Sequence, residues 1–101
     1  MSKFVLSSEA REDLIDIYVY TEERWDEEQA DRYLDSFYVI IEGLTLSSGK
    51  GRPELHPEVR SVNNGTHVVL FMPHEGEVGI VRVLHGARDI DGLFRDFDPE
   101  F

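Results

Sequence analysis

Two apolar runs in the second half of the sequence constrain the fold more than any other feature. Residues 67–72 and 78–85 are rich in β-branched and aromatic residues, and the intervening PHEGE is typical of a hairpin loop. Neither run alternates polar with apolar residues, so both pleat faces of each predicted strand are apolar. A sheet with one solvated face alternates. Both faces of this hairpin therefore need a cover, either from this chain or from a partner.

The first half of the sequence predicts two amphipathic helices. Apolar side chains recur at spacings of three and four over residues 10–25, directly after serines that suit a helix N-terminus. A second helix is predicted to begin after Asp26, because DEEQ has the form of a capping box. Its apolar stripe runs over residues 30–44. With almost no linker, the helices should form an antiparallel hairpin whose two stripes, Trp25 included, face one core.

The remaining segments complete an α+β architecture. Residues 47–57, SSGKGRPELHP, contain several helix breakers and are predicted to be a loop, whereas 3–6 and 59–62 are short β-type runs. Asn63-Asn64-Gly65 is a turn signal. We therefore predict one domain over residues 1–101, an N-terminal helical hairpin packed on a mainly antiparallel sheet of about three or four strands.

A helical hairpin covers only one face of such a sheet. The sequence shows no clear third layer, which favours a partner protein on the second face. The acidic, aromatic tail over residues 89–101, which carries Phe94, Phe97 and Phe101, is the alternative cover, as a short amphipathic helix and tail.

Composition excludes several functional classes. The formal net charge is -11, which disfavours nucleic-acid binding through the overall field of the protein. The chain has no cysteine, so disulfides and thiolate metal sites are excluded, and nothing in the sequence predicts a metal or a cofactor. No apolar run approaches the roughly 20 residues of a membrane span. We expect a cytoplasmic protein without direct, sequence-specific nucleic-acid binding.

An ordered series of segments resembles one protein family. LSSEAREDLIDIYVY, WDEEQADRYLDSF, GRPEL, VRSV, HVVLF and IVRVLHGARD together cover nearly all of residues 4–89. In this order they are similar to the ParE toxins of the RelE/ParE superfamily, known also as plasmid-stabilisation proteins. The resemblance implies the same hairpin-on-sheet fold.

The resemblance also implies a function. The chain would be the toxin of a type II toxin-antitoxin pair that binds and inhibits DNA gyrase, acts as an inhibitor rather than an enzyme, and is neutralised by a ParD-like antitoxin in a higher-order complex. We expect binding through the apolar sheet surface, its arginine-bearing edges and an exposed strand edge. Ala87, Phe71 and the acidity depart from the family pattern and leave open an inactive homologue that retains antitoxin binding. The candidate target-binding or antitoxin-binding residues are Arg52, Arg60, Phe71, Arg82, His85, Arg88, Phe94 and Phe97.

The functional alternative is a RelE-like, ribosome-dependent mRNA endonuclease. Its candidate catalytic residues would be Arg60, Arg82, His85 and Arg88, since RNA cleavage needs an acid, a base and cations near the phosphate. Arg82 and His85 are an odd number of positions apart, so a regular strand sends them to opposite faces. Residues 51–101 also contain no lysine. The sequence thus favours binding. The purely structural interpretations are an Arg82 guanidinium that reaches a carboxylate or a carbonyl, and a hydrogen-bonded pair of His85 and Asp89 that fixes the turn at Gly86.

Overall fold

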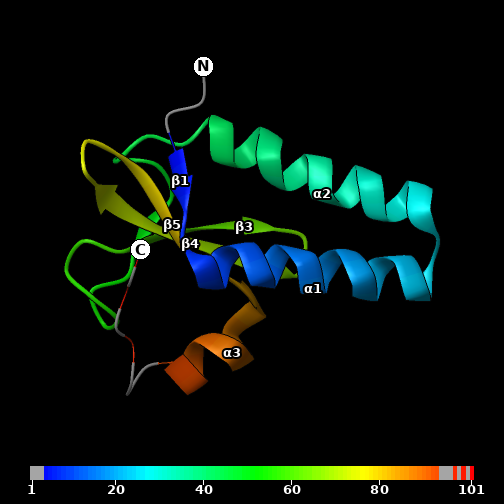
Figure 1. Ribbon diagram of the computed structural model, residues 1–101. Coiled ribbons are helices and arrows are strands. Elements are labelled where there is room, and N and C mark those ends of the chain that lie inside the picture. The colour runs from blue at the N-terminus through cyan, green and yellow to red at the C-terminus, as the bar shows by residue number, and fades with distance from the viewer. Residues whose placement is uncertain (1–3, 94–96, 98, 100) are drawn as a thin grey trace.

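The computed structural model describes residues 4–93, 97, 99 and 101 and shows a helical hairpin packed on a mixed five-stranded sheet (Figure 1). This confirms the predicted α+β class. The elements in chain order are β1 (Phe4–Leu6), α1 (Ser8–Arg24), α2 (Glu27–Glu42), β2 (Lys50–Gly51), β3 (Arg60–Asn64), β4 (His67–His74), β5 (Glu77–His85) and α3 (Gly86–Leu93).

Both long helices begin where the sequence predicts. The Ser7 hydroxyl accepts a hydrogen bond from the main-chain N–H of Ala10 at 3.0 Å, and the Asp26 carboxylate accepts one from Gln29 at 2.7 Å. Each side chain thereby satisfies one of the free N–H groups at a helix start. The helix boundaries are therefore encoded locally.

The helices run antiparallel, as predicted (Figure 1). A polar side-chain contact links them. The Tyr18 hydroxyl donates to Asp31 at 2.8 Å, and this hydrogen bond to a carboxylate raises the pKa of Tyr18 to about 12. The predicted burial of Trp25 is wrong, because this side chain is 68% exposed. Its backbone, with φ -120 and ψ -90, has already left the helix, so the apolar stripe of α1 does not extend to it.

The strand order is β1-β5-β4-β3-β2, with β1 parallel to β5 and every other pair antiparallel. The predicted strand count misses β2, which spans only two residues inside the predicted loop. A strand of that length carries no alternation signal. The hairpin turns are tighter than predicted, since β3 includes Asn64 and β4 includes Pro73 and His74.

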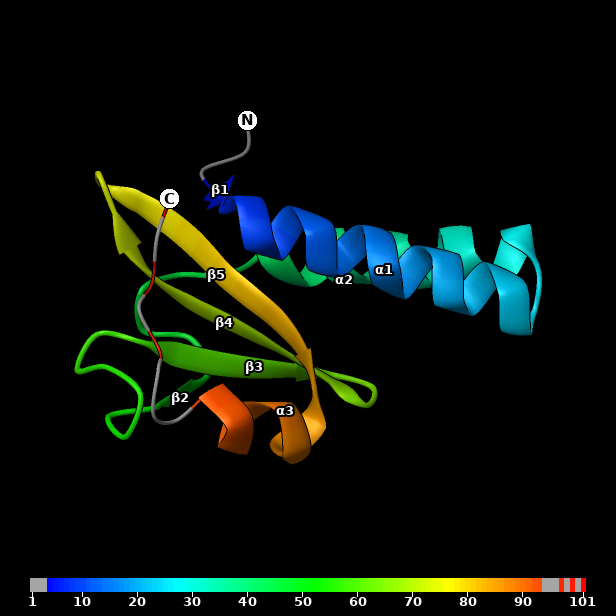
Figure 2. The same cartoon turned by 60° about the horizontal axis from the view of Figure 1, so that its bottom comes forward.

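Two hydrophobic clusters lie on opposite faces of the sheet. The first packs the sheet against the helical hairpin and includes Phe37, Ile41 and Phe71. The second lies on the other face, where α3 packs beneath the sheet (Figure 2). The second cluster consists of Val59, Val68, Leu70, Val81, Leu84 and Ile90, with Leu55, Met72, Leu93 and Phe97 packed against it.

This second cluster corrects one expectation. The chain covers both sheet faces itself, with α3, Phe97 and the loop that contains Leu55, so the prediction that a partner covers the second face is wrong. In the described residues this cover is a short helix, α3, with Phe97 of the tail, in line with the alternative of a short helix and tail, whereas Phe94 lies outside the described residues. A third layer was missed because α3 is only eight residues long.

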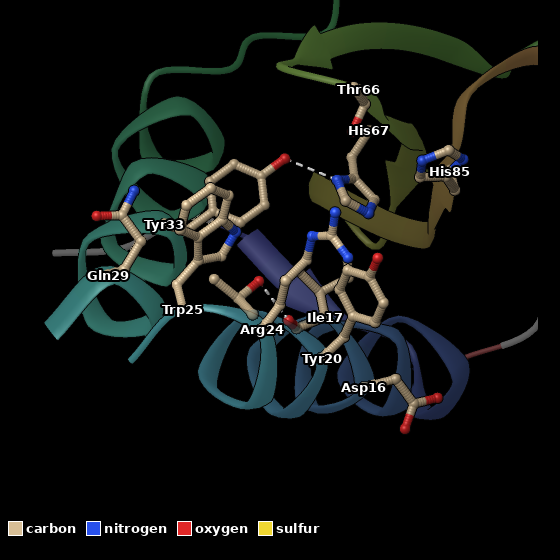
Figure 3. A pocket seen from close by; sticks show the side chains of 11 residues that line it. Asp16, Ile17, Tyr20, Arg24, Trp25, Gln29, Tyr33, Thr66, His67 and His85 are labelled. Atoms are coloured by element: carbon tan, nitrogen blue, oxygen red, sulfur yellow. Dashed lines mark hydrogen bonds between the residues drawn. The ribbon is translucent and has the colours of Figure 1, made fainter. Parts of the chain in front are cut away.

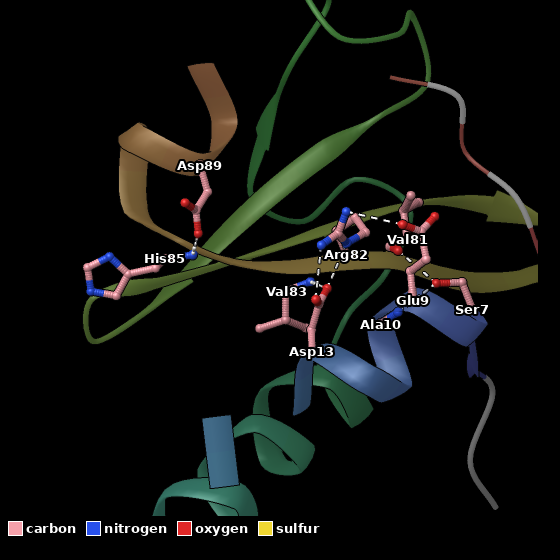
Figure 4. A network of polar contacts seen from close by, with 9 residues as sticks. All are labelled: Ser7, Glu9, Ala10, Asp13, Val81, Arg82, Val83, His85 and Asp89. Atoms are coloured by element: carbon pink, nitrogen blue, oxygen red, sulfur yellow. Dashed lines mark hydrogen bonds and ion pairs between the residues drawn. The ribbon is translucent and has the colours of Figure 1, made fainter. Parts of the chain in front are cut away.

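The outer edge of β5 is closed by side chains of the α1 region. β1 pairs with β5 only from Val78 to Ile80. Beyond this point the Ser7 hydroxyl donates to the carbonyl of Val81 at 2.7 Å, and the Asp13 carboxylate accepts from the N–H of Val83 at 2.9 Å (Figure 4). These main-chain groups of the β5 edge are thus unavailable to another strand.

A bulge at the same place turns Arg82 toward α1. The register passes from Phe71 opposite Ile80 to Leu70 opposite Arg82, which leaves Val81 as the extra residue. The Arg82 guanidinium then donates to both oxygens of Asp13, from Nε at 2.8 Å and from Nη2 at 3.0 Å. This bond raises the pKa of Arg82 above its ordinary value. The purely structural interpretation of Arg82, a guanidinium bonded to a carboxylate, is what the fold contains.

The Ser7→Ala variant should lower the free energy of unfolding by about 1–2 kcal/mol, because it loses the cap of α1 and the bond to Val81. Urea denaturation followed by circular dichroism measures this loss. Ser8→Ala is the matched control, since Ser8 is exposed, and it should change stability by less than about 0.5 kcal/mol. Equal losses in the two variants would contradict the role assigned to Ser7.

The Asp13→Ala variant should lower the free energy of unfolding by roughly 3 kcal/mol, because it leaves the largely buried Arg82 and the Val83 N–H without their main acceptor. The same denaturation measurement tests it. Glu9→Ala removes the outer partner of Arg82. The Glu9 side chain is 60% exposed, and its Oε2 lies 3.2 Å from Nη1 of Arg82. That control should cost under about 1 kcal/mol. A Glu9 variant as damaging as the Asp13 variant would refute this assignment.

Candidate functional site

Three of the predicted interface arginines, Arg52, Arg60 and Arg82, are engaged within the chain. Arg52 donates from Nε to the Ser61 hydroxyl at 2.8 Å, which ties the GRP loop to β3. Arg60 donates from Nε to the carbonyl of Ser48 at 2.6 Å and from Nη2 to that of Gly49 at 3.0 Å. Both guanidinium groups therefore brace the segment between α2 and β3, as Arg82 braces α1.

The predicted aromatic contacts do not form one surface. Phe71 is fully buried between the sheet and the helical hairpin, so its ring is not on the surface of this fold. Phe97 packs on the opposite face of the sheet. Arg88 belongs to α3, but its side chain lies outside the described part of the structure, as does the whole of Phe94.

The end of β5 forms the predicted turn. Gly86 has a φ of 62°, in the region that favours glycine, and α3 begins there. The predicted bond between His85 and Asp89 exists through the main chain, since the N–H of His85 donates to the Asp89 carboxylate at 2.9 Å (Figure 4). The imidazole of His85 remains exposed. It is thus separated from Arg60 and Arg82, which turn to other parts of the chain.

A groove that the sequence does not predict opens between the helical hairpin and one end of the sheet (Figure 3). Its volume is about 680 Å³, and we call it the histidine groove. Its members come from segments far apart in the chain, which is why no local motif indicates it. Its main side chains are Tyr20, Arg24 and Trp25 at the end of α1, Tyr33 of α2, and His67 and His85 of the sheet.

A hydrogen-bonded network fixes one wall of the histidine groove. The Tyr33 hydroxyl lies 2.6 Å from Nδ1 of His67 and 3.1 Å from the carbonyl of Asn64. The rings of His67 and His85 meet edge to face, with centroids 5.3 Å apart. Burial, and then the neighbouring His85, lower the pKa of His67, whereas burial raises the pKa of Tyr33. Both side chains are therefore mainly uncharged at neutral pH.

A second, more apolar groove lies on the other side of α1. It has a volume of about 410 Å³ and runs between α1 and α2, past Leu14, Ile15 and Leu34. Ile15, which lines this groove, is 56% exposed. We call this groove the outer hairpin face. Its composition is that of a surface which binds another protein.

The described residues of the two grooves do not form a cluster of metal ligands. No group of three or more metal-ligating side chains occurs among the residues that the structure describes. No helix in the described ranges is long and apolar enough to cross a membrane. The two grooves present aromatic faces, imidazoles, apolar side chains, the guanidinium groups of Arg24 and Arg11 and the carboxylate of Asp16.

Comparisons with known proteins agree with this fold. The family model described as "ParE toxin of type II toxin-antitoxin system, parDE" matches residues 4–90. "Toxin ParE1" of Caulobacter vibrioides is 38% identical over 87 residues, which is 84% of this chain and 90% of that protein. "Toxin ParE1" of Mycobacterium tuberculosis is 32% identical over 93 residues, which is 89% of this chain and 95% of that protein.

A solved structure shows the same fold. The chain superposes with a TM-score of 0.72 on a chain of "Chromosomal ParDE TA system from P. aeruginosa", at 22% identity and over 85% of this chain and 97% of that one. The family match spans the structure from β1 to α3, and the relatives are aligned over nearly their whole length. The chain belongs to the family of ParE toxins of type II toxin-antitoxin systems.

Proposed function

We propose that this ParE-family protein acts in the cytoplasm by binding and inhibiting DNA gyrase, and that a ParD-like antitoxin neutralises it in a higher-order complex. The observation that carries the proposal is the family match over residues 4–90, which includes both helices of the hairpin and every strand. The relatives at 32% and 38% identity are themselves named toxins.

The contacts of the cationic side chains support binding over catalysis. Among the candidate catalytic residues whose side chains are described, Arg60 is bonded to loop carbonyls and Arg82 to carboxylates of α1. His85 points into a different part of the molecule, the histidine groove. A phosphate could not reach these three groups together without breaking internal contacts. Phosphoryl chemistry needs such groups to be preorganised around one position.

The outer hairpin face is our proposed docking surface for the antitoxin. Both faces of the sheet are covered, and the β5 edge is occupied by Ser7 and Asp13. The exposed apolar side chains of the hairpin remain, and an amphipathic segment that folds on binding would bury them. We retain His85 as a candidate target contact, since its imidazole is exposed.

Expression of the chain alone in bacteria should arrest growth, and the purified protein should reduce supercoiling by DNA gyrase without ribosome-dependent cleavage of mRNA. A gel assay of relaxed plasmid with gyrase, and primer extension on translated mRNA, measure the two activities. The control is the toxin mixed beforehand with the ParD-like protein of a neighbouring reading frame, which should restore supercoiling. Cleavage of mRNA would instead support the RelE-like alternative, and the absence of both effects would support an inactive homologue.

Replacing Ile15 by Ser should weaken antitoxin binding about tenfold, because a half-exposed isoleucine buried in the complex contributes roughly 1.4 kcal/mol. Isothermal titration calorimetry with the purified antitoxin measures the change. Tyr20→Ser is the matched control, since Tyr20 is similarly exposed but lines the histidine groove on the other side of α1. Antitoxin affinity that falls with Tyr20→Ser and not with Ile15→Ser would place the interface elsewhere.

A further inference from the structure

Two large aromatic side chains are exposed beside the histidine groove. Trp25, which follows the apolar spacing of α1 in the sequence, is 68% exposed, and Tyr20 is 63% exposed. Both line the groove, as Figure 3 shows. An exposed aromatic face can stack on a planar ring, and such stacking is how proteins commonly hold nucleobases. The groove therefore offers a surface for an aromatic ring.

Arg24 supplies a cation in the same groove. Among the described residues no ion pair or hydrogen bond engages its side chain, although α1 and α2 are rich in carboxylates. By contrast, Arg32 on α2 pairs with Glu28 at 2.6 Å. The guanidinium of Arg24 extends toward His67 in Figure 3. An unpaired guanidinium presents a planar set of donors that suits a phosphate.

The two histidines add hydrogen-bonding groups to the part of the groove that Arg24 faces. Nδ1 of His67 is held by Tyr33, so Nε2 is the ring nitrogen left for a ligand. The Tyr33 hydroxyl donates its proton to the carbonyl of Asn64, so Nδ1 of His67 donates to the Tyr33 oxygen. Nε2 then donates to an oxygen when the imidazole is protonated, the form that a bound phosphate favours. His85 adds an exposed imidazole beside it. A phosphate oxygen can thus meet Arg24 and an imidazole from two sides.

We propose that the histidine groove binds a nucleoside monophosphate, with the base on Trp25 or Tyr20 and the phosphate between Arg24 and the two histidines. The groove volume of about 680 Å³ lies within the usual range of about 300–1,000 Å³ for small-molecule sites. This binding is additional to the proposed toxin activity and does not depend on it.

The charge of the protein selects a single nucleotide over a longer nucleic acid. Each further phosphate would lie in the field of a chain whose formal net charge is -11. The cationic and imidazole groups of the groove suffice for one phosphate only. A free mononucleotide and the end of a single strand share the same chemistry, so the experiment must compare the two.

Titration of the isotope-labelled protein with AMP, followed by NMR, tests the proposal. AMP should cause saturable shifts of the Trp25 indole and of the His67 and His85 ring signals, with a Kd below about 1 mM. Adenosine and inorganic phosphate, each given alone, should bind at least about tenfold more weakly, because each uses half of the site. A single-stranded oligonucleotide should bind no more tightly than AMP.

Two variants and one control sharpen the test. Arg24→Gln should weaken AMP binding about tenfold through the lost charge-assisted hydrogen bonds, and Trp25→Leu should weaken it through lost stacking. Both positions are exposed, so circular dichroism should show an unchanged fold. Arg32→Gln, an exposed arginine outside the groove, should leave AMP affinity unchanged. The proposal is overturned by the absence of saturable shifts, by equal affinity for adenosine and AMP, by full affinity in Arg24→Gln, or by tighter binding of the oligonucleotide.

Discussion

The rest of the fold depends on the hydrogen bonds that the Asp13 carboxylate accepts. This carboxylate accepts three hydrogen bonds, two from the Arg82 guanidinium and one from the N–H of Val83. The side chains of this pair are 14% and 23% exposed, so the ion pair is weakly screened. It fixes α1 across the edge of β5 at the bulge formed by Val81. The same contact thus closes a strand edge, places the hairpin and removes Arg82 from the surface.

With that edge closed, both apolar faces of the sheet lie inside the molecule rather than on its surface. Hydrophobic clusters fill both of its faces, one under the helical hairpin and one under α3. A partner that needs apolar contacts must therefore use the helices or the ends of the sheet. Under this constraint, the surfaces left for a partner or a ligand are the outer hairpin face and the histidine groove.

Local signals in the sequence predict the helix starts at Ser7 and Asp26 and the turn at Gly86, because each depends on a neighbour within four residues. The site is different. The bulge at Val81 arises from pairing between β4 and β5, and the histidine groove joins Trp25 to His67 only after the hairpin has folded over the sheet. Contacts of this kind leave no periodic trace in the sequence, so the strand pattern and the family resemblance predict Arg82 and Phe71 as interface residues although the fold engages both internally.

The two candidate surfaces share α1 and lie on opposite sides of it. Tyr20 and Arg24 belong to the groove facing the sheet, whereas Ile15 belongs to the outer hairpin face. A ligand on one side can change affinity on the other only if it moves α1. Any such movement would stretch the bonds of Asp13 to Arg82 and Val83, which hold the helix in one position. The structure therefore favours two sites that are occupied independently, with a protein on one side of α1 and a small ligand on the other.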